Sequence, residues 1–504
     1  MRLSCVAVFF FMKKVGAGMN LQTQRWYLVG MKGTGMASLA VLLAHMGCRV
    51  RGCDRDEIFF TDTLLTKEGL ICDVGFTEAL LEDDTTSVIY SSAYPLTTPI
   101  LQAAKERNLP LYSYPAFIAL LTKRQDSYAV AGTHGKTTTC SVASHLLGQA
   151  TSSEFPFYAV YGSSQTGLER YPYYGSECAL FEACEYQDHF LSYDLRAVLV
   201  TSIEYDHPDY FQSINHVKRS FETLVSNLRG GGIFIYCSDD EGASALSVYV
   251  LSHRKDITTI AYGFSAPGPF RIMKKGPDAY TLAVLPDLPF TVQAKAKALV
   301  CDHIGALVLS LAMILDRPEP KLYVRDQGLI TDEVLPTLVA SLSRHLRSYT
   351  ACTGRTEVLF AQDGVVYIDD YAHHPSEIRT SLEEVRARYP HYKVLVVFSP
   401  HTASRTIAFY NQFAEELALC DALVVQATYP SARGDGPSGE DPAEAIVRQV
   451  ASHPMNHCVY AKDEETAEAF ASLWLQEQWL CITMGAGNNR GLCARIAHRR
   501  RSHS

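Results

Sequence analysis

The chain has 504 residues, of which 47% are hydrophobic and 20% charged, with a net charge of -9 at pH 7 and a pI near 6.0. This length exceeds what one hydrophobic core supports, so two to four domains are expected. The acidic balance argues against bulk nucleic-acid binding, and local basic and dipolar groups must therefore hold any anionic ligand. The 14 cysteines show no Cys-x-x-Cys pair, which indicates reduced thiols in a cytoplasmic protein.

Residues 1–24 are expected to be a leader, either poorly ordered or the product of a misassigned start codon. A short apolar run, residues 5–12, follows Arg2, so a secretory signal peptide is the alternative interpretation. No apolar run approaches the roughly 18 residues that span a bilayer, and no membrane association is expected.

A first domain is expected over residues 25–124. A strand at 26–29, a glycine-rich turn at 30–36, a helix at 37–46 and a strand at 48–52 form a βαβ unit. Asp54 follows the glycines by about twenty residues, which is the layout of a dinucleotide-binding fold. Because Lys32 interrupts the strict glycine pattern, the anion could be NAD or another diphosphate.

A second polar turn follows a later strand of the same domain. Ser91 and Ser92 come directly after the strand at 87–90, at the carboxyl end where ligands gather in parallel sheets. Ordinary turn chemistry is the alternative explanation for these serines.

A central domain is expected over residues 125–348, organised around the stretch 128–141. A buried strand runs into a turn from Gly132 to Gly135, and a helix follows at 137–147. Free N–H groups and the positive dipole end of that helix suit a polyphosphate. Lys136 would add a charge at the β/γ-phosphates and Thr137 a hydroxyl ligand for Mg²⁺. Val130 departs from the general P-loop pattern, and an ordinary strand-to-helix turn is the alternative.

Further metal ligands are expected at two other strand ends of this domain. Residues 151–176 are rich in Ser, Gly and Tyr and are predicted to be a surface insertion. Beyond them, a strand at 179–185 ends in acids and a strand at 197–201 leads to an acid- and histidine-containing segment. Glu182 and His207 are the candidates for a second Mg²⁺, and solvated strand ends are the alternative.

A third domain is expected over residues 349–504. Strands at 365–368, 394–398, 421–426 and 479–483 alternate with helices such as 376–388, which predicts a mostly parallel sheet. Dense polar segments again follow the strands. They favour a site at the carboxyl edge of the sheet.

These stretches together resemble the Mur ligase family, over nearly the whole chain from about Trp26. The order and spacing of the motifs carry the resemblance: residues 30–36, 91–93, 132–138, 182–185, 204–207, 354–357, 369–375, 399–406 and 485–487. The resemblance implies an α/β fold of three domains: a Rossmann-like N-terminal domain, a central P-loop-type ATPase domain and a Rossmann-like C-terminal domain. It also implies an ADP-forming ligase of cytoplasmic peptidoglycan precursor synthesis. ATP and Mg²⁺ would be its cofactors.

The substrates implied by the resemblance are UDP-N-acetylmuramate and L-alanine, handled by a monomer or weak homodimer. Residues carried over for the UDP-sugar are Gly30, Lys32, Gly33, Thr34, Gly35, Met36, Asp54, Ser91 and Ser92. Those for ATP are Gly132, Thr133, His134, Gly135, Lys136, Thr137, Thr138, His303 and Asp370. Those for the amino acid are Tyr371, His374, His401 and Arg405, and those for metal are Thr137, Glu182 and His207. The catalytic set is Lys136, His207, Arg355 and His374.

The implied chemistry is activation of a carboxylate as an acyl phosphate, followed by attack of an amine. Lys136 and Arg355 would neutralise converging negative charge. His374 or His401 could accept the amine proton, and Arg405 suits an α-carboxylate through its fork of donors.

The sequence departs from the family pattern at several positions. Ile304 and Leu307 replace two asparagines usual after the histidine at 303, Thr98 replaces the asparagine usual before proline, and Thr402 stands where a basic residue is usual. Two alternatives stay open: a recycling ligase of the same superfamily that attaches a preformed peptide, and a catalytically silent sugar-nucleotide sensor, which Ile304 and Leu307 motivate.

Overall fold

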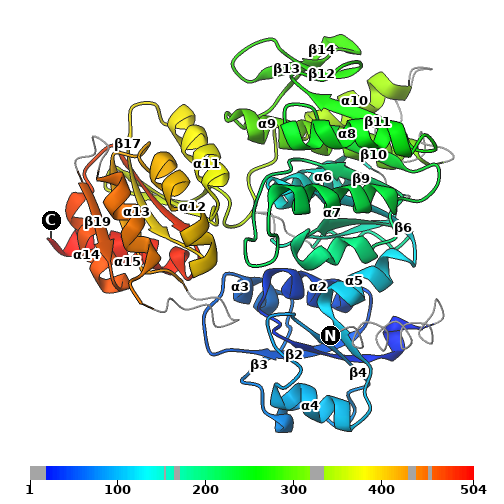
Figure 1. The fold of residues 1–504 in the computed structure, drawn as a ribbon, viewed down its shortest axis with the longest axis horizontal. Coiled ribbons are helices and arrows are strands. Elements are labelled where there is room, and N and C mark those ends of the chain that lie inside the picture. Colours follow the sequence, from blue (N-terminus) through cyan, green and yellow to red (C-terminus); the bar gives the residue numbers. More distant parts are fainter. Residues whose placement is uncertain are drawn as a thin grey trace.

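The computed structural model describes residues 19–151, 155–163, 171–317, 334–429, 439–451 and 457–503. Three successive segments of the chain each build an α/β body around one sheet, and the bodies are separate in Figure 1. The predicted three-domain α/β fold is confirmed. Of the predicted leader, the first 18 residues lie outside the described part, whereas Leu21 is buried in the first core.

The N-terminal domain has a five-stranded parallel sheet of order β3-β2-β1-β4-β5. Its strands are β1 (Arg25–Val29), β2 (Arg49–Asp54), β3 (Cys72–Val74), β4 (Ser87–Tyr90) and β5 (Leu111–Ser113). Its helices are α2 (Thr34–His45), α3 (Thr61–Lys67), α4 (Pro99–Glu106) and α5 (Tyr114–Thr122). The crossovers put helices on the faces of the sheet, so its middle strands are apolar and buried.

The central domain has a nine-stranded sheet of order β14-β13-β12-β11-β10-β9-β6-β8-β7. Its strands are β6 (Asp126–Ala131), β7 (Phe157–Val160), β8 (Cys178–Ala183), β9 (Ala197–Val200), β10 (Ile233–Cys237), β11 (Thr258–Gly263), β12 (Phe270–Lys274), β13 (Ala279–Leu282) and β14 (Leu285–Thr291). Its helices are α6 (Lys136–Ala150), α7 (Ile214–Ser226), α8 (Glu241–His253), α9 (Lys297–Leu315) and α10 (Val334–Arg344). The last three strands add an antiparallel extension at one edge.

Two predictions about the central domain are wrong. Residues 151–176 are not only a surface insertion, because β7 is fully buried and pairs in parallel with β8. Helix α9 is apolar and long enough to cross a membrane by composition, whereas the sequence suggested no such run. However, 83% of the apolar stretch of this helix is buried inside the domain, where α9 packs along α6. It is therefore a core helix.

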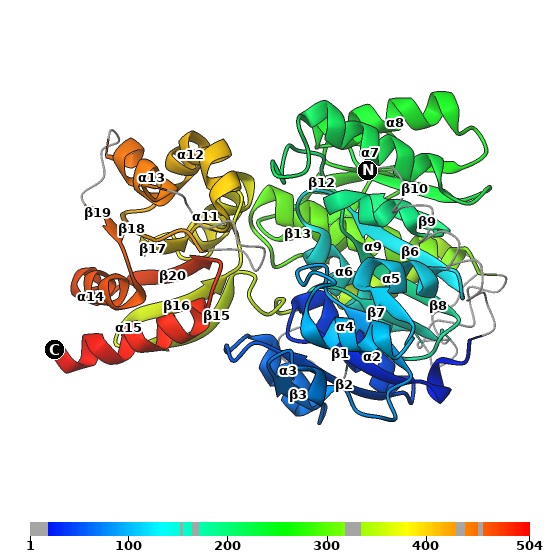
Figure 2. The ribbon, with the colours of Figure 1, turned by 60° about the horizontal axis from the view of Figure 1, so that its bottom comes forward.

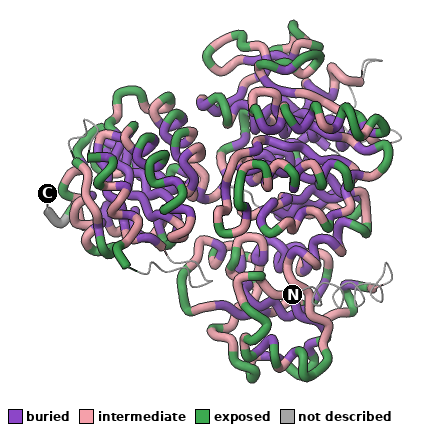
Figure 3. The backbone as a smooth tube through the Cα atoms, in the orientation of Figure 1, coloured by how far each residue is buried: buried purple, intermediate pink, exposed green. Residues whose placement is uncertain are grey.

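The C-terminal domain has a six-stranded sheet of order β15-β16-β20-β17-β18-β19, parallel except for β15. Its strands are β15 (Glu357–Gln362), β16 (Val365–Asp370), β17 (Lys393–Ser399), β18 (Ala422–Gln426), β19 (His457–Ala461) and β20 (Trp479–Gly485). Its helices are α11 (Pro375–Arg388), α12 (Ala403–Leu417), α13 (Pro442–Val450), α14 (Glu464–Trp474) and α15 (Asn489–His503). Figure 3 shows buried chain concentrated in the sheet of each body.

Side chains from different domains touch where the bodies meet. The Tyr171 hydroxyl of the central domain lies 2.9 Å from the Ser38 hydroxyl on α2, and Ser163 donates to the Thr353 carbonyl at 2.8 Å. In Figure 2 helix α11 lies on the side of the C-terminal body that faces the central body, where it contacts α9. The polar strand ends therefore border a common space.

Candidate active site

The phosphate-binding loop predicted from the sequence joins β6 to α6. Gly132 and Gly135 adopt positive φ angles of 140° and 79°. A Cβ atom at Gly132 would lie 2.0 Å from the Thr201 hydroxyl, and one at Gly135 would lie 2.4 Å from an Asp302 carboxylate oxygen. Only glycine fits both positions. Gly135 caps α6 without a side-chain hydrogen bond, so the first N–H groups of the helix can bind an anion.

The side chain of Lys136 folds back over this loop. Its ammonium group donates to the carbonyls of Gly132 and Thr133 and to Glu185 Oε2, which lies 3.0 Å away. Burial alone would lower the pKa of Lys136, but Glu185 outweighs this effect and keeps the group charged. Glu185 is 2% exposed and was not among the predicted site residues. It holds the lysine at the loop.

Thr137 and Glu182, which the sequence analysis assigned to two different metal ions, are in direct contact. The Thr137 hydroxyl donates to Glu182 Oε1 at 2.9 Å, and Glu182 Oε2 accepts from the Gly162 N–H at 2.7 Å. A Cβ atom at Gly162 would lie 3.3 Å from the Thr34 hydroxyl of the N-terminal domain. The glycine-rich turn of the first domain thus ends beside the acid of the second.

His207 faces Glu185 rather than Glu182. Its Nε2 atom lies 3.7 Å from Glu185 Oε1 and 3.8 Å from Asp206 Oδ2, and its φ is 53°. Burial lowers the pKa of His207, which leaves a neutral imidazole. Among the described residues Glu185 Oε1 is buried without a hydrogen-bond partner. A neutral imidazole beside an unpaired buried carboxylate oxygen is a donor set that fits a divalent cation.

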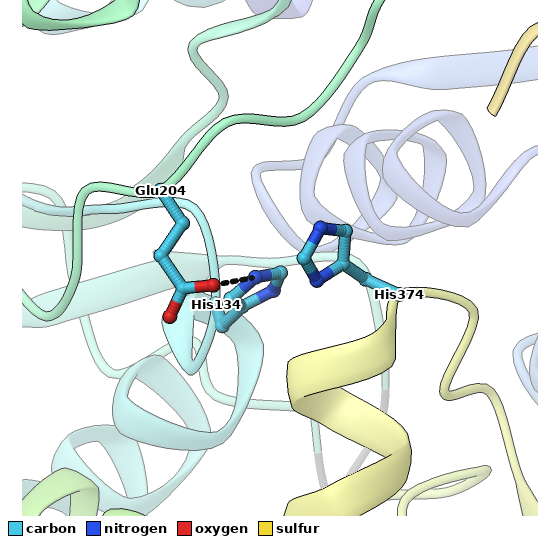
Figure 4. Close-up of side chains that lie close together, drawn as sticks. All are labelled: His134, Glu204 and His374. Carbon is cyan, nitrogen blue, oxygen red and sulfur yellow. Dashed lines mark ion pairs between the residues drawn. The ribbon is translucent and has the colours of Figure 1, made fainter. Parts of the chain in front are cut away.

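His134 of the loop lies between acids from two domains, as Figure 4 shows for Glu204. Its Nε2 is 3.7 Å from Glu204 and its Nδ1 is 3.5 Å from Glu377 on α11. Burial would lower the pKa of His134, but the two carboxylates raise it to about 10. Ligating atoms of His134, Glu204 and His374 all lie within 4.8 Å of one another. Because the imidazolium already supplies the positive charge, this cluster is an ion-pair network.

His374 caps helix α11. Its Nδ1 accepts the Ser376 N–H at 3.3 Å, and its Nε2 donates to the Tyr205 carbonyl at 3.3 Å. Burial lowers its pKa to about 4. Both ring nitrogens are therefore engaged in this arrangement, and the ring joins the C-terminal domain to the central one.

The neighbouring His373 has a different tautomer. Its Nδ1 lies 2.9 Å from the Tyr371 carbonyl and 3.5 Å from Glu377 Oε2, so this nitrogen carries the proton. The lone pair then lies on Nε2. Burial lowers the pKa of His373 to about 4. Beside it, Arg355 lies over the Tyr371 ring at 5.3 Å and 3.8 Å from Glu377 Oε1.

Arg405 and His401 lie together where α12 meets the central domain. The Arg405 guanidinium holds Asp206 with two nitrogens, at 2.9 and 3.2 Å, and both side chains are almost fully buried. Its Nη1 lies 3.4 Å from His401 Nδ1. Burial lowers the pKa of His401 to about 3. Asp206 was not predicted, because nothing local in the sequence pairs it with an arginine 199 residues away.

The glycine-rich turn of the N-terminal domain is held by internal bonds. Gly30 has a φ of 83° and packs against Ser91 and Tyr94. Buried Asp54 accepts from the Lys32 N–H at 2.7 Å and from the Tyr94 hydroxyl at 2.8 Å. Asp54 therefore shapes the turn, and the free N–H groups at the start of α2 remain available, because Gly33 caps it without a side-chain bond.

The remaining predicted residues of this turn differ in exposure. A Cβ atom at Gly35 would meet the Tyr114 hydroxyl at 2.7 Å, and the Met36 side chain belongs to the core. Ser92 is exposed after β4, while the Ser91 hydroxyl accepts the Ala93 N–H.

The hydrogen bonds of two predicted ATP residues go to other parts of the chain. Asp370 accepts from the Thr356 and Ser381 hydroxyls and from the Ala372 N–H, all within its own domain. His303 bonds the Leu299 carbonyl along α9, and burial lowers its pKa to about 4. The preceding residue, Asp302, is the one that packs against the loop, and burial raises its pKa to about 8. Thr138 is half-buried in the first turn of α6.

Comparison with known families matches most of the chain. Residues 25–126 match the model "Mur ligase family, catalytic domain", residues 130–275 match "Mur ligase middle domain", and residues 354–487 match "Mur ligase, glutamate ligase domain". The three matches follow the three sheets in order.

Individual relatives match nearly end to end. The chain is 29% identical to a protein from Treponema pallidum, and the match covers 92% of this chain and 94% of that protein. It is 30% identical to a protein from Borreliella burgdorferi, and that match covers 92% of this chain and 96% of the relative. Both relatives are named UDP-N-acetylmuramate–L-alanine ligase.

The fold also matches solved structures. A UDP-N-acetylmuramate-alanine ligase from Thermotoga maritima has a TM-score of 0.73 at 20% identity, covering 95% of this chain and all of that one. A murein peptide ligase from Psychrobacter arcticus has a TM-score of 0.65 at 16% identity, covering 95% and 98%. The motifs, the three-sheet architecture and these relatives agree, and the chain belongs to the Mur ligase family.

Proposed function

We propose that the chain joins L-alanine to the lactyl carboxylate of UDP-N-acetylmuramate, with conversion of ATP to ADP and phosphate. The observation that carries the proposal is the convergence of anion-holding groups from three sheets. Thr34 lies beside Gly162 and Glu182, and Arg405 reaches Asp206 across the next domain boundary. The names of the relatives support the choice of both substrates.

The domains would divide the ligands among them. We propose limits of 25–124 for the UDP-sugar domain, 125–348 for the ATP domain and 349–504 for the amino-acid domain. The sheets support these limits, because β1–β5, β6–β14 and β15–β20 form separate sheets. We propose that the reaction takes place in the cytoplasm, because ATP and nucleotide sugars are supplied there. It would belong to peptidoglycan precursor synthesis.

In the first step an oxygen of the lactyl carboxylate attacks the γ-phosphorus of ATP. The bond to the leaving ADP oxygen breaks, and an acyl phosphate forms. Repulsion between the two anions opposes this approach, so positive groups at the point of contact lower the barrier. Lys136 lies at the loop, held by Glu185, and Arg355 comes from the C-terminal domain.

Divalent cations would bind at two places beside this loop. Thr137 and Glu182 would hold one Mg²⁺, and His207 with Glu185 would hold a second. Bound there, Mg²⁺ would neutralise charge on the β- and γ-phosphates. Oxygen donors predominate among these residues, as Mg²⁺ prefers.

In the second step the neutral amine of alanine attacks the acyl carbon, and phosphate leaves. Arg405 would bind the alanine carboxylate, because its guanidinium offers further donors beside the pair that holds Asp206. We propose His373 as the acceptor of the amine proton. Its Nδ1 is bonded to the Tyr371 carbonyl, which leaves the lone pair on Nε2, whereas both nitrogens of His374 are engaged.

A coupled assay of ADP release tests this function. With UDP-N-acetylmuramate and ATP present, we expect ADP release to require L-alanine. Release only with L-Ala-γ-D-Glu-diaminopimelate would identify a recycling ligase instead. Binding of the UDP-sugar without any ADP release would identify a sensor, which the substitutions Ile304 and Leu307 motivate.

A further inference from the structure

A second cluster of side chains that could bind a metal lies at the end of strand β10, which strand β9 separates from β6 in the central sheet. Cys237 ends strand β10, Asp239 lies in the following turn, and Cys301 lies in the second turn of α9. Their two sulfur atoms and one carboxylate oxygen lie within 4.8 Å of one another. Both cysteines are buried, with exposed fractions of 5% and 4%.

The carboxylate of Asp239 is oriented by its surroundings. Its Oδ2 atom faces the cysteines and accepts from the Cys301 thiol at 3.8 Å and from the Phe264 N–H. Its Oδ1 atom faces outward, 2.8 Å from the Lys297 ammonium and 3.0 Å from the Ser265 hydroxyl. Outer partners of this kind fix the direction of a metal-ligating carboxylate.

The local charges favour a divalent ion. Two thiolates and one carboxylate would carry three negative charges, and a divalent ion together with the Lys297 ammonium would balance them. Thiolates select borderline and soft metals such as Zn²⁺ and Cd²⁺ over Mg²⁺. The side chain of Lys297 is 62% exposed and that of Asp239 8%, so an ion would enter past Lys297.

We propose that Cys237, Asp239 and Cys301 form a binding site for one thiophilic divalent metal ion, of the Zn²⁺ class, with solvent completing its coordination. The ion replaces the two thiol protons, which are released to water. Affinity should therefore rise steeply with pH. The site is separate from the residues proposed for Mg²⁺ and does not depend on the proposed ligase activity.

The test is a Cd²⁺ titration of the reduced full chain, monitored by the thiolate-to-Cd²⁺ charge-transfer absorption. We expect one tight equivalent per chain. Cys301→Ser and Cys237→Ser should each weaken it by about 100-fold or more, and Asp239→Asn by about tenfold. Cys481→Ser/Cys493→Ser is the matched control, because it removes another pair of adjoining buried thiols, in the C-terminal domain. That variant should keep the tight equivalent.

A second measurement needs no substitution. Zn²⁺ should slow the alkylation of Cys237 and Cys301, read by mass spectrometry of the peptides, while the slower alkylation of the fully buried Cys481 and Cys493 should not change with Zn²⁺. The proposal is overturned if the wild-type chain shows no tight Cd²⁺ equivalent, if the control variant loses it as well, or if Zn²⁺ leaves the alkylation of Cys237 and Cys301 unchanged.

Discussion

Arg405 of the C-terminal domain donates two hydrogen bonds to the carboxylate of Asp206 of the central domain, from Nε at 2.9 Å and from Nη2 at 3.2 Å, and both side chains are almost fully buried. Burial disfavours the charged carboxylate, but Arg405 holds the pKa of Asp206 well below its usual range. The two domains are therefore joined at the place where the amino acid is proposed to bind.

Arg405→Lys keeps the positive charge of this contact but removes the fork of donors. We expect the KM for L-alanine to rise by roughly 10- to 100-fold, because a lysine cannot bond a carboxylate bidentately. The KM for ATP should change less than about twofold. Arg379→Lys on the exposed face of α11 is the control, since Arg379 pairs there with Glu416, which lies in the same domain. If the KM for ATP rises instead, Arg405 does not bind the alanine carboxylate as proposed.

Lys136→Met removes the charge at the phosphate-binding loop. We expect kcat to fall by about 10²-fold or more, through lost stabilisation of charge in the transition state, while the Kd for UDP-N-acetylmuramate stays unchanged. Because the substitution leaves buried Glu185 unpaired, Lys136→Met/Glu185→Gln should recover thermal stability but not activity. Near-normal turnover in either variant would exclude the proposed role of Lys136.

Neighbouring histidines offer a matched comparison. His373→Asn should lower kcat by about 10²- to 10⁴-fold, the contribution of a positioned proton acceptor. His374→Asn should retain most of kcat, because asparagine replaces the cap of α11 that His374 provides. Single-turnover rates measure the effect of each substitution on the chemical step, and thermal unfolding measures its effect on stability. If His374→Asn loses more kcat than His373→Asn, His374 is the proton acceptor instead.

The His134 network predicts how stability depends on pH. The pKa of His134 is raised to about 10 in the folded chain, so its contribution is complete below its ordinary pKa of about 6.5 and is lost as pH rises toward 10. The pKa of Glu204 is lowered to about 2, so its contribution is lost only as pH falls below about 4.5. We expect the Tm of the wild-type chain to fall by about 3 °C between pH 6.5 and 9.5. The Tm of His134→Asn should fall by less over the same range.

His391→Asn, a change at an exposed surface histidine, is the control for that experiment. It should leave the alkaline decline of the wild-type chain intact. Identical pH profiles for the wild-type chain and His134→Asn would show that His134 is not charged between the two acids.

The elements that carry the site could be predicted because parallel sheets collect polar residues at one edge. Strand β4 occurs at the predicted residues, and Gly132, Lys136 and Thr137 form the expected turn and helix start. Strand β7 was missed because a segment rich in Ser, Gly and Tyr surrounds its four apolar residues.

The partners of the site residues could not be predicted, because they come from distant parts of the chain. Glu377 reaches His134 from another domain, and Asp206 reaches Arg405 in the same way. The tautomers of His373 and His374 depend on carbonyl groups that only the folded backbone places. Hydrophobic periodicity and motif spacing predict local structure, so they cannot predict contacts between residues that are far apart in the chain.

The most direct measurement of the central claim follows oxygen from substrate to product. UDP-N-acetylmuramate labelled with ¹⁸O at both lactyl carboxylate oxygens is turned over with ATP and L-alanine, and the phosphate is analysed by mass spectrometry. If the active site activates the carboxylate as an acyl phosphate, each phosphate released carries one ¹⁸O atom. Unlabelled phosphate, released at the same rate as the amide product, would contradict the account.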